Sequence, residues 1–466
     1  LVANNYTATL VLLYHTPQQA TVGMKGIAEM GYDLEKIPAQ PSPHSTYQDY
    51  LDRDRNEPTP ILREIGNADQ GTESIPVEHY IDRGFYERER GMWERVWQVA
   101  CREEHIPKAG DYHVYEILKR SYLIVRTESG EIKAYPNACL HRGRKLRAES
   151  GHADEFRCPF HGFTWALDGS NAHVPCEWDF PQIEKEKFGL PEIQVGTFAG
   201  WVFINPDTKA MPLEDYLDPI ARHYEPYAWD QSYLASHVGK VLKGNWKVIQ
   251  EAFMESFHAL DTHPQIMGSV DDFGCQYDTW EGKPHVNRMM AVFAAPSSYV
   301  VDQVTEQDVL DEWIGRKAGD LGGYELRPGE TAREATADIN RDRVEAMLGR
   351  EVPDLSDAEL IDGWYYNVFP NLMLWGGFGP NMWYRFRPWQ DNHEETLMEV
   401  GFIARHPKGE PKPTPAPMNF LSIDEPWDEA EELGGLGFVL DQDTTNMAGV
   451  QEGLNASFKP GVTLAS

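Results

Sequence analysis

The amino-acid sequence predicts an α+β protein with two main domains: a small antiparallel β domain over residues 110–206 and a larger domain of helices and strands over residues 207–466. From Tyr112 onward the chain runs in short β-branched and aromatic segments, such as Tyr122–Arg126, which are typical of strands. Turn signals such as Ser129-Gly130 separate these segments. After Pro206 the patterns of helix and strand become longer, so we place the domain change there.

Two segments precede the β domain. Residues 1–75 are interpreted as a leader and an extended arm, because the first 23 residues carry no Asp, Glu, Lys or Arg and residues 40–73 show no sustained periodicity. The leader lacks the basic start of a signal peptide, so we expect the working N-terminus near Met24. Apolar residues from Val77 to Glu104 recur mostly at intervals of three and four, which predicts an amphipathic helical segment over residues 76–109.

Composition excludes several classes of function. The chain of 466 residues has 42 Lys plus Arg and 74 Asp plus Glu, and its formal charge of −32 opposes binding to nucleic acid or anionic membranes. No run approaches the roughly 18 consecutive apolar residues of a membrane span. The five cysteines are too few and too scattered for a secreted disulfide framework, which favours a soluble protein in a reducing cytoplasm.

The most specific motif is Cys139-Leu-His141, followed after sixteen residues by Cys158-Pro-Phe-His161. Two thiolates suit one iron, and two neutral imidazoles on a second iron give a [2Fe–2S] cluster a higher potential than four thiolates would. This combination predicts a Rieske cluster. The alternative is a structural zinc site, but zinc fingers pair two cysteines in one half of the motif and two histidines in the other.

The segments Cys139–Gly143 and Cys158–Gly162, followed by Trp165, resemble the Rieske domain of the Rieske non-haem iron oxygenases. Respiratory Rieske proteins are the rival family. They carry two further cysteines where this chain has Arg144 and Phe160, and they have a membrane helix that this sequence lacks. The oxygenase family therefore fits better. The remaining cysteines are expected to be buried core thiols; they are Cys101, Cys176 and Cys275.

A short basic stretch lies between the two ligand pairs. Arg142, Arg144, Lys145 and Arg147 put four positive charges within six residues of an acidic chain. A cationic rim around a redox centre would steer an acidic electron donor, so we predict an electron-donor docking surface here. A generic solvated basic turn explains the same pattern equally well.

A second constellation follows at His258 and His263-Pro264. On a continuous helix, Glu251 and Glu255 would share one face with His258, and Pro264 would let the second imidazole turn back. Two imidazoles and one distant carboxylate form the facial triad of a mononuclear Fe(II) oxygenase, although such a His pair by itself is more often core packing.

The resemblance to Rieske oxygenases extends to this region. The segment Asn245-Trp-Lys, a carboxylate and two histidines match the family pattern, which implies that His258 and His263 bind iron. It also implies that Glu255 takes the place of the acidic residue that links the two metal sites. Most ring-hydroxylating members have Asp there, and Glu is similar to the branch that oxidises quaternary ammonium compounds.

The third iron ligand is expected near the C-terminus. In the family, a liganding Asp precedes a Gln-x-Gly-Leu segment, and counting back from Gln451 selects Asp443, with Asp441 as its competitor. Either acid could instead serve as a plain helix N-terminal residue.

The resemblance covers about residues 80–460. It implies a Rieske domain joined to a helix-grip catalytic domain, in which an antiparallel sheet and a long helix enclose the iron, with the 76–109 segment packing on it. It also implies electron flow through Glu255 to iron that activates O₂, and a homotrimer or α3β3 assembly. The sequence shows no dinucleotide-binding or plant-type ferredoxin motif, so we expect a separate NAD(P)H reductase and possibly a ferredoxin.

The leading functional prediction is hydroxylation of an aromatic or polycyclic substrate. The alternatives are oxidative demethylation or oxidation of a quaternary ammonium substrate and, outside enzymes, a Rieske electron carrier. Between the site motifs, residues 302–360 are expected to form a solvated helical insertion, with a helix that begins at Asp357 after a capping box. Trp364–Phe369 and Met382–Phe386 are predicted aromatic-rich strands that line a pocket or pack in the core.

Overall fold

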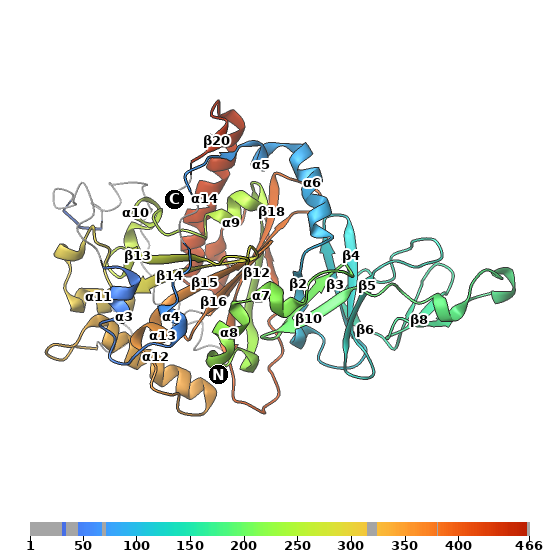
Figure 1. Cartoon of the computed structure of the whole chain (residues 1–466), viewed down its shortest axis with the longest axis horizontal. Helices are drawn as coiled ribbons and strands as arrows, with labels where there is room; N and C mark the ends of the chain where they lie inside the picture. The colour runs from blue at the N-terminus through green and yellow to red at the C-terminus, as the bar shows by residue number, and fades with distance from the viewer. Residues whose placement is uncertain (1–29, 34–44, 68–70, 315–323, 380, 464–466) are drawn as a thin grey trace.

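The computed structural model describes residues 30–33, 45–67, 71–314, 324–379 and 381–463, so the expected start near Met24 lies outside the described residues. The α+β prediction is confirmed: helices surround one large antiparallel sheet, and a smaller β lobe projects from its side (Figure 1). Within the described residues, no helix combines the length and the apolar character needed to span a membrane.

The large sheet has eight strands in the order β13-β14-β15-β16-β17-β18-β12-β19, and all neighbours pair antiparallel except β12 and β19. The strands are β12 (Ser232–Lys243), β13 (Val270–Thr279), β14 (Val286–Phe293), β15 (Gly363–Val368), β16 (Leu372–Gly376), β17 (Met382–Pro388), β18 (Glu395–Arg405) and β19 (Asn419–Leu421). Both predicted aromatic-rich strands are confirmed as β15 and β17.

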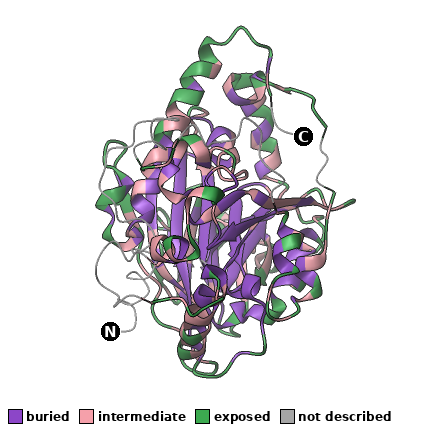
Figure 2. Cartoon of the chain, turned by 90° about the vertical axis from the view of Figure 1, so that its left-hand side faces the viewer, coloured by how far each residue is buried: buried purple, intermediate pink, exposed green. Residues whose placement is uncertain are grey.

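The two faces of this sheet pack against different cores. Because successive side chains of a strand point to opposite faces, Trp364 and Tyr366 of β15 enter one hydrophobic cluster and Tyr365 faces another. The second cluster includes residues of the short helix α9 (Trp246–Glu251) and of the long helix α14 (Leu436–Ala456). The strands are buried along most of their length (Figure 2). This is the antiparallel sheet with a long helix that the resemblance implied.

The smaller lobe consists of short antiparallel strands. Its two main sheets have the orders β5-β4-β3-β6 and β7-β8-β9. The strands are β3 (Asp111–Ile117), β4 (Arg120–Arg126), β5 (Ile132–Pro136), β6 (Gly151–His152), β7 (Glu155–Arg157), β8 (Thr164–Ala166) and β9 (Asn171–His173). A third sheet, β10-β11-β2, lies between this lobe and the large sheet; its strands are β2 (Gln98–Arg102), β10 (Gln194–Phe198) and β11 (Trp201–Asn205).

The helical interpretation of residues 77–104 is correct only in its first part. Helices α5 (Glu78–Ile81) and α6 (Arg83–Trp93) are present, and Trp93 packs edge-on against Trp246 of α9 with ring centroids 5.5 Å apart. Residues 98–102 instead form β2, which pairs with β11. Every residue of β2 is buried, so its apolar residues carry no strand alternation that could separate them from a helical pattern.

The arm is more ordered than expected. Residues 45–67 contain two short helices, α3 (Tyr47–Leu51) and α4 (Pro60–Arg63), where an extended segment was predicted. Thr46 and Asp49 form a capping box that starts α3. Arg55 then binds the buried carboxylate of Asp357 at 2.7 Å, which ties the arm to the larger domain.

Residues 302–360 contain α11 (Glu306–Trp313), α12 (Ala332–Leu348) and α13 (Asp357–Ile361). The predicted helix start at Asp357 is confirmed by a capping box between Ser356 and Glu359. The expectation of a solvated insertion is wrong for α13, because all five of its residues are buried. The charged residues suggested a solvated helix, but Asp357 and Glu359 bind Arg55 and Tyr227, which are distant in the sequence.

A buried ion cluster joins the two lobes. Glu399 of β18 accepts bidentate hydrogen bonds from Arg385 at 2.6 and 2.7 Å and from Arg387 at 2.9 and 3.1 Å, and it contacts His237 Nε2 at 3.1 Å. Arg385 also donates to backbone carbonyls of β2, and Arg387 donates to the backbone carbonyl of Glu116 in β3. The cluster therefore fixes the small lobe against the large sheet.

The remaining elements are short. They are the β1–β20 pair (Ile75–Pro76 and Gly461–Val462), α7 (Leu213–Leu217), α8 (Ile220–Tyr224), α10 (Ala259–Thr262) and single 3₁₀ turns: η2 (Glu103–His105), η3 (Glu177–Asp179), η4 (Lys185–Lys187), η5 (Glu225–Tyr227), η6 (Trp229–Gln231), η7 (Pro264–Ile266), η8 (Val301–Gln303), η10 (Trp427–Glu429) and η11 (Glu431–Leu433).

Candidate metal centres

The two Cys/His loops of the small lobe have the same backbone construction. The N–H of Gly143 donates to the carbonyl of Cys139 at 2.9 Å, and the N–H of Gly162 donates to that of Cys158 at 3.0 Å. Both glycines have positive φ, 74° and 82°, a conformation that side chains disfavour. The shared spacing of four residues from Cys to Gly is therefore the signature of one turn used twice.

The side chains of these loops converge so that the two cysteines lie together and the two histidines lie together. The Cys139 and Cys158 thiols are buried and hydrogen-bonded to each other, and the rings of His141 and His161 lie 4.7 Å apart. A two-iron cluster with thiolates on one iron and imidazoles on the other needs this pairing, so the four residues fit a Rieske centre. The ring of Phe163 stacks on His141 at 4.5 Å and forms part of an apolar lining.

The surface near the two imidazoles is apolar and exposed. Phe160, whose ring centroid lies 3.7 Å from that of His161, is 56% exposed. Trp178, which is 80% exposed, lies two residues before Phe180, whose ring centroid is 5.6 Å from that of His141. The prediction of buried core thiols holds for Cys101. It is wrong for Cys176, which is exposed because it lies at the start of a surface 3₁₀ turn, and Cys275 is half-buried.

The basic stretch divides into two parts. Arg142 and Arg144 are exposed. Lys145 forms an ion pair with Glu116, and Arg147 donates to the backbone carbonyl of Glu155 at 2.7 Å. Arg144 donates to the backbone carbonyl of Lys145. Arg142 and Arg144 therefore present exposed guanidinium groups, whereas the charge of Lys145 is already paired with an acid.

The second histidine pair lies on a turn and a short helix. Helix α9 ends at Glu251, so the expectation that Glu251, Glu255 and His258 share one helical face is wrong. Glu251 accepts a hydrogen bond from Tyr80 at 2.9 Å instead. His258 precedes the short helix α10 and His263 follows it, immediately before Pro264, so the two imidazoles flank one helical turn.

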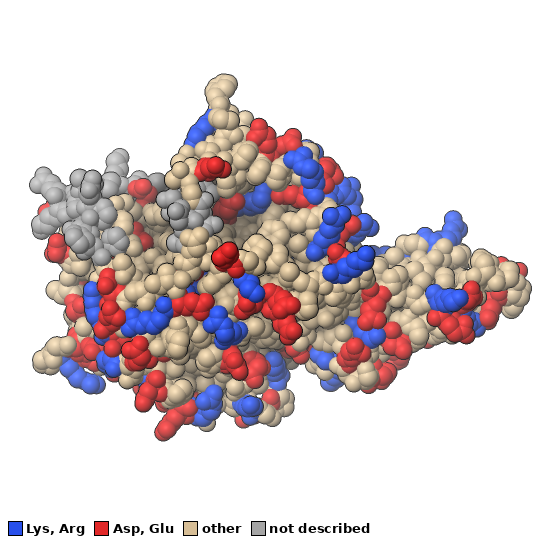
Figure 3. All heavy atoms as spheres, in the orientation of Figure 1, with Lys and Arg blue, Asp and Glu red and all other residues tan. Residues whose placement is uncertain are grey.

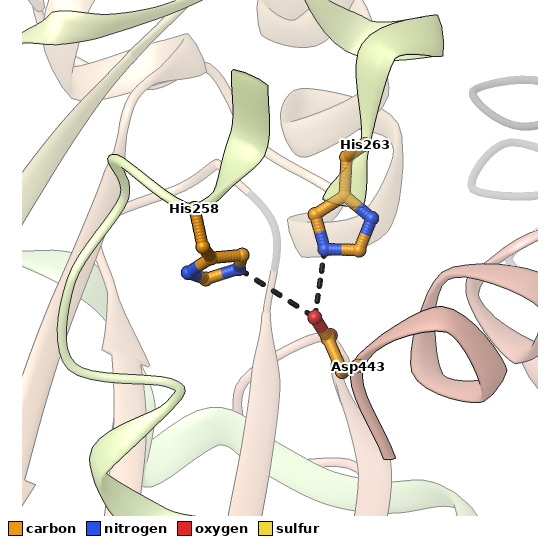
Figure 4. Close-up of side chains that lie close together, drawn as sticks. All are labelled: His258, His263 and Asp443. Atoms are coloured by element: carbon orange, nitrogen blue, oxygen red, sulfur yellow. Dashed lines mark hydrogen bonds and ion pairs between the residues drawn. The ribbon is translucent and has the colours of Figure 1, made fainter. Parts of the chain in front are cut away.

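The structure brings His258, His263 and Asp443 together (Figure 4). One ligand atom of each lies within 4.8 Å of the others. His263 Nε2 is 2.8 Å and His258 Nε2 is 3.5 Å from the same oxygen of Asp443, which α14 supplies. Two imidazole nitrogens and one carboxylate, converging from separate elements, are the donor set of a mononuclear iron site.

The far side of each imidazole is held by a different partner. His258 Nδ1 lies 2.6 Å from Glu255 Oε1, and His263 Nδ1 lies 3.0 Å from Gln442 Oε1. Such partners orient metal-binding rings and set which nitrogen faces the metal. Sequence reasoning predicted Glu255 and missed Gln442, whose only signal is that it directly precedes Asp443.

The two candidate acids on α14 point in different directions. Asp443 shares the inward face of the helix with Val439 and Leu440 and is buried. Asp441 accepts hydrogen bonds from the backbone N–H groups of Trp427 at 2.8 Å and Asp428 at 3.1 Å. The structure thus places Asp443 beside the histidines and Asp441 in a capping role.

Electrostatics in this site favour a cation. Burial alone would raise the pKa of Asp443, but the two imidazoles lower it to about 2. Burial lowers the pKa of His258, yet hydrogen bonds to Asp443 and Glu255 raise it to about 10. Positive charge between the carboxylates of Asp443 and Glu255 is therefore strongly stabilised, as a divalent metal site requires.

Comparison with known proteins agrees with both centres. Residues 96–184 match the family of Rieske [2Fe-2S] domains, and residues 213–466, more than half of the chain, match the catalytic domain of ring-hydroxylating alpha subunits.

Among curated relatives, the chain is 28% identical over 199 residues to the glycine betaine monooxygenase oxygenase subunit of Pseudomonas aeruginosa, a match that covers 42% of this chain and 46% of that one. It is 31% identical over 209 residues to the biphenyl 2,3-dioxygenase alpha subunit of Rhodococcus jostii, covering 43% and 45%. It is 30% identical over 250 residues to the carnitine monooxygenase oxygenase subunit of Escherichia coli, covering 52% and 65%. The chain thus spans about half the length of the first two relatives.

Solved structures show the same fold. A quaternary ammonium Rieske monooxygenase in complex with L-carnitine superposes with a TM-score of 0.57 at 19% identity, covering 83% of this chain and 87% of that one. Naphthalene 1,2-dioxygenase with indole bound gives a TM-score of 0.58 at 21% identity, covering 84% and 83%. The chain belongs to the ring-hydroxylating oxygenase alpha-subunit family, with a Rieske [2Fe–2S] domain ahead of a mononuclear-iron catalytic domain.

Proposed function

We propose that the protein is the catalytic subunit of a Rieske oxygenase that hydroxylates a neutral aromatic or polycyclic substrate. In this proposal Cys139 and Cys158 bind one iron of the cluster, and His141 and His161 bind the other. The mononuclear iron is held by the triad described above, and when bound it supplies the activation of O₂.

The observation that carries the substrate class is an aromatic layer on the sheet face that packs against α14, the helix that supplies Asp443. Tyr365, Trp375 and Tyr384 lie on the face of the sheet that packs against α14, and the ring of Tyr365 meets that of Trp375 at a centroid distance of 3.7 Å. Phe253, two residues before Glu255, packs on Tyr384 at 5.3 Å. A planar apolar ring is recognised by offset and edge-on contacts with such side chains.

We propose that Glu255 links the two metal centres of neighbouring subunits. Glu255 binds the ring of His258, and Phe257 beside it is 55% exposed. Within one chain the sites lie at opposite sides of the molecule, with α10 and α14 on one side and β6 and β8 on the other (Figure 1). This separation supports transfer between subunits of a homotrimer or an α3β3 assembly.

We propose that an acidic ferredoxin or a reductase docks at Arg142 and Arg144 and delivers electrons from NAD(P)H. The competing surface lies around α6 and the turn between β3 and β4, where lysine and arginine side chains gather on the face shown in Figure 3. Lys119 of that turn is paired with Asp391, and Arg120, the first residue of β4, is paired with Glu94. The basic residues there are thus partly neutralised.

Charge reversal at the two surfaces distinguishes them. Arg142→Glu combined with Arg144→Glu should slow reduction of the cluster at low salt and flatten its salt dependence, because fewer charges steer the donor. Lys119→Glu combined with Arg120→Glu is the matched control. If the control slows reduction and the first pair does not, the donor docks at α6.

A second substrate class has a specific observation in its favour. Glu255 stands where most ring-hydroxylating members have Asp, and the relatives include glycine betaine and carnitine monooxygenases. Aromatic faces also bind quaternary ammonium groups through cation–π contacts. We therefore treat oxidation or demethylation of such a cation as the alternative.

Substrate screening with a reconstituted reductase and ferredoxin tests the proposal. Oxygen consumption coupled to a hydroxylated product is expected with naphthalene or biphenyl and not with carnitine or glycine betaine. Turnover of the quaternary amines alone would overturn the proposed substrate class. A chain that holds only the cluster iron and consumes no oxygen with any substrate would instead be an electron carrier. We also propose a cytoplasmic location, because the cysteine pair must stay reduced until it binds the cluster.

A further inference from the structure

Helix α14 supplies more than the carboxylate of the mononuclear site. Gln442, the residue before Asp443, places its side-chain oxygen 3.0 Å from His263 Nδ1 and 2.7 Å from Gln265 Nε2. We propose that Gln442 is a positioning residue that fixes the orientation and tautomer of His263. The inference rests on the proposed triad.

The hydrogen bonds define the tautomer. Because Gln265 donates its amide N–H to Gln442 Oε1, that oxygen is an acceptor, and the His263 nitrogen that faces it must carry hydrogen. Nδ1 therefore carries a hydrogen. Nε2, which lies 2.8 Å from Asp443, is then the nitrogen that binds a metal when the ion takes the place of its proton.

The two histidines are thus held by chemically different partners. His258 faces a carboxylate, Glu255, whereas His263 faces a neutral amide. The amide nitrogen of Gln442 is buried and has no hydrogen-bond partner among the described residues. Replacing that nitrogen by a carboxylate oxygen would remove no hydrogen bond, so Gln442→Glu keeps the acceptor while Gln442→Leu removes it at similar size.

The same helix face offers a matched control. Asn446, one turn after Gln442, donates to Thr262 Oγ1 at 3.1 Å and so also ties α14 to α10, without touching either imidazole. Asn446→Ala removes a hydrogen bond between the two helices but leaves Gln442, the hydrogen-bond partner of His263, in place. It separates the positioning of the ring from the docking of the helix.

The test uses the full chain with its cluster intact, after chelation of the mononuclear iron. Fe(II) is titrated back anaerobically, and binding is followed by the electron paramagnetic resonance signal of the ferrous nitric-oxide adduct, with the visible spectrum of the cluster and the thermal midpoint as folding controls. Gln442→Leu should weaken Fe(II) binding by about 10- to 100-fold. Gln442→Glu and Asn446→Ala should bind within a few-fold of the unmodified protein.

Two outcomes overturn the inference. Unchanged Fe(II) affinity in Gln442→Leu would show that the amide does not position the ring. Equal losses in the Leu, Glu and Ala variants would show a general effect of helix docking. If the unmodified protein itself takes up no Fe(II) at this site, the proposed triad fails, and that result differs from a defect confined to Gln442→Leu.

Discussion

Replacing Glu399 should weaken the attachment of the small lobe to the large sheet most clearly. Glu399 is 1% exposed and accepts four hydrogen bonds from two guanidinium groups, those of Arg385 and Arg387, which are themselves largely buried. Glu399→Gln removes the compensating charge and leaves two buried cations facing an amide. Breaking a buried ion pair in this way costs about 3–5 kcal/mol, which corresponds to a fall of about 6–20 °C in the unfolding midpoint of a domain of this size.

The assay is thermal unfolding followed by circular dichroism, with the absorption of the Rieske cluster as a reporter for the small lobe. Glu395→Gln on the same strand is the control, because Glu395 is only half-buried. Both reporters should shift in Glu399→Gln, since the arginines also bind the backbones of β2 and β3. A midpoint equal to that of the control would refute the assigned role of the cluster.

The pH dependence of this contribution follows from the sign of the pKa shift. Burial would raise the pKa of Glu399, but Arg385 and Arg387 hold it well below its usual value. A carboxylate with a depressed folded-state pKa stabilises the protein fully above its unfolded pKa of about 4.3. The difference between Glu399→Gln and the unmodified protein should therefore be constant from pH 5 to 8 and shrink only as the pH falls below about 4.

Three further predictions concern the metal centres. Asp443→Ala should lose the mononuclear iron with the cluster spectrum unchanged, whereas Asp441→Ala should keep it, and metal analysis that shows the reverse would move the third ligand. Glu255→Gln should slow substrate-dependent reoxidation of the reduced cluster in a stopped-flow experiment, and an unchanged rate would remove Glu255 from the transfer path. Reversing Arg142 and Arg144 should lower the rate of reduction at low salt by about tenfold or more, and equal rates would rule out docking there.

The sequence was most informative where functional residues are close together along the chain. The two Cys-x₃-Gly turns place their ligands within a few residues of a glycine that needs positive φ, so the spacing in the sequence already indicates the turn. Asp443 lies 180 residues from His263, and no spacing rule connects them. Only the family resemblance selected it, and the position of Gln442 directly before Asp443 was the only sign of Gln442 in the sequence.

Two errors in the predicted fold have the same physical origin. Residues 98–102 and 357–361 are buried on all sides, and their partners come from distant strands and from the N-terminal arm. In a fully buried segment the sequence lacks the apolar–polar alternation that distinguishes a strand from a helix. A buried acid also cannot be told from a solvated one in the sequence until its partner is known. The helix expected to run through Glu255 failed for a related reason. The backbone N–H of Ser256 donates to the hydroxyl of Tyr277, and the Ser256 and Tyr277 hydroxyls are also hydrogen-bonded, which holds that segment as a turn.

The central claim is that one chain carries two separate iron centres. Iron and acid-labile sulfide measured together on the purified full chain test it most directly. Two occupied sites predict about three irons and about two sulfides per chain, because the cluster holds two irons and the triad one. About two irons with about two sulfides, in protein prepared with excess Fe(II), would contradict the mononuclear site and leave a protein that only carries electrons.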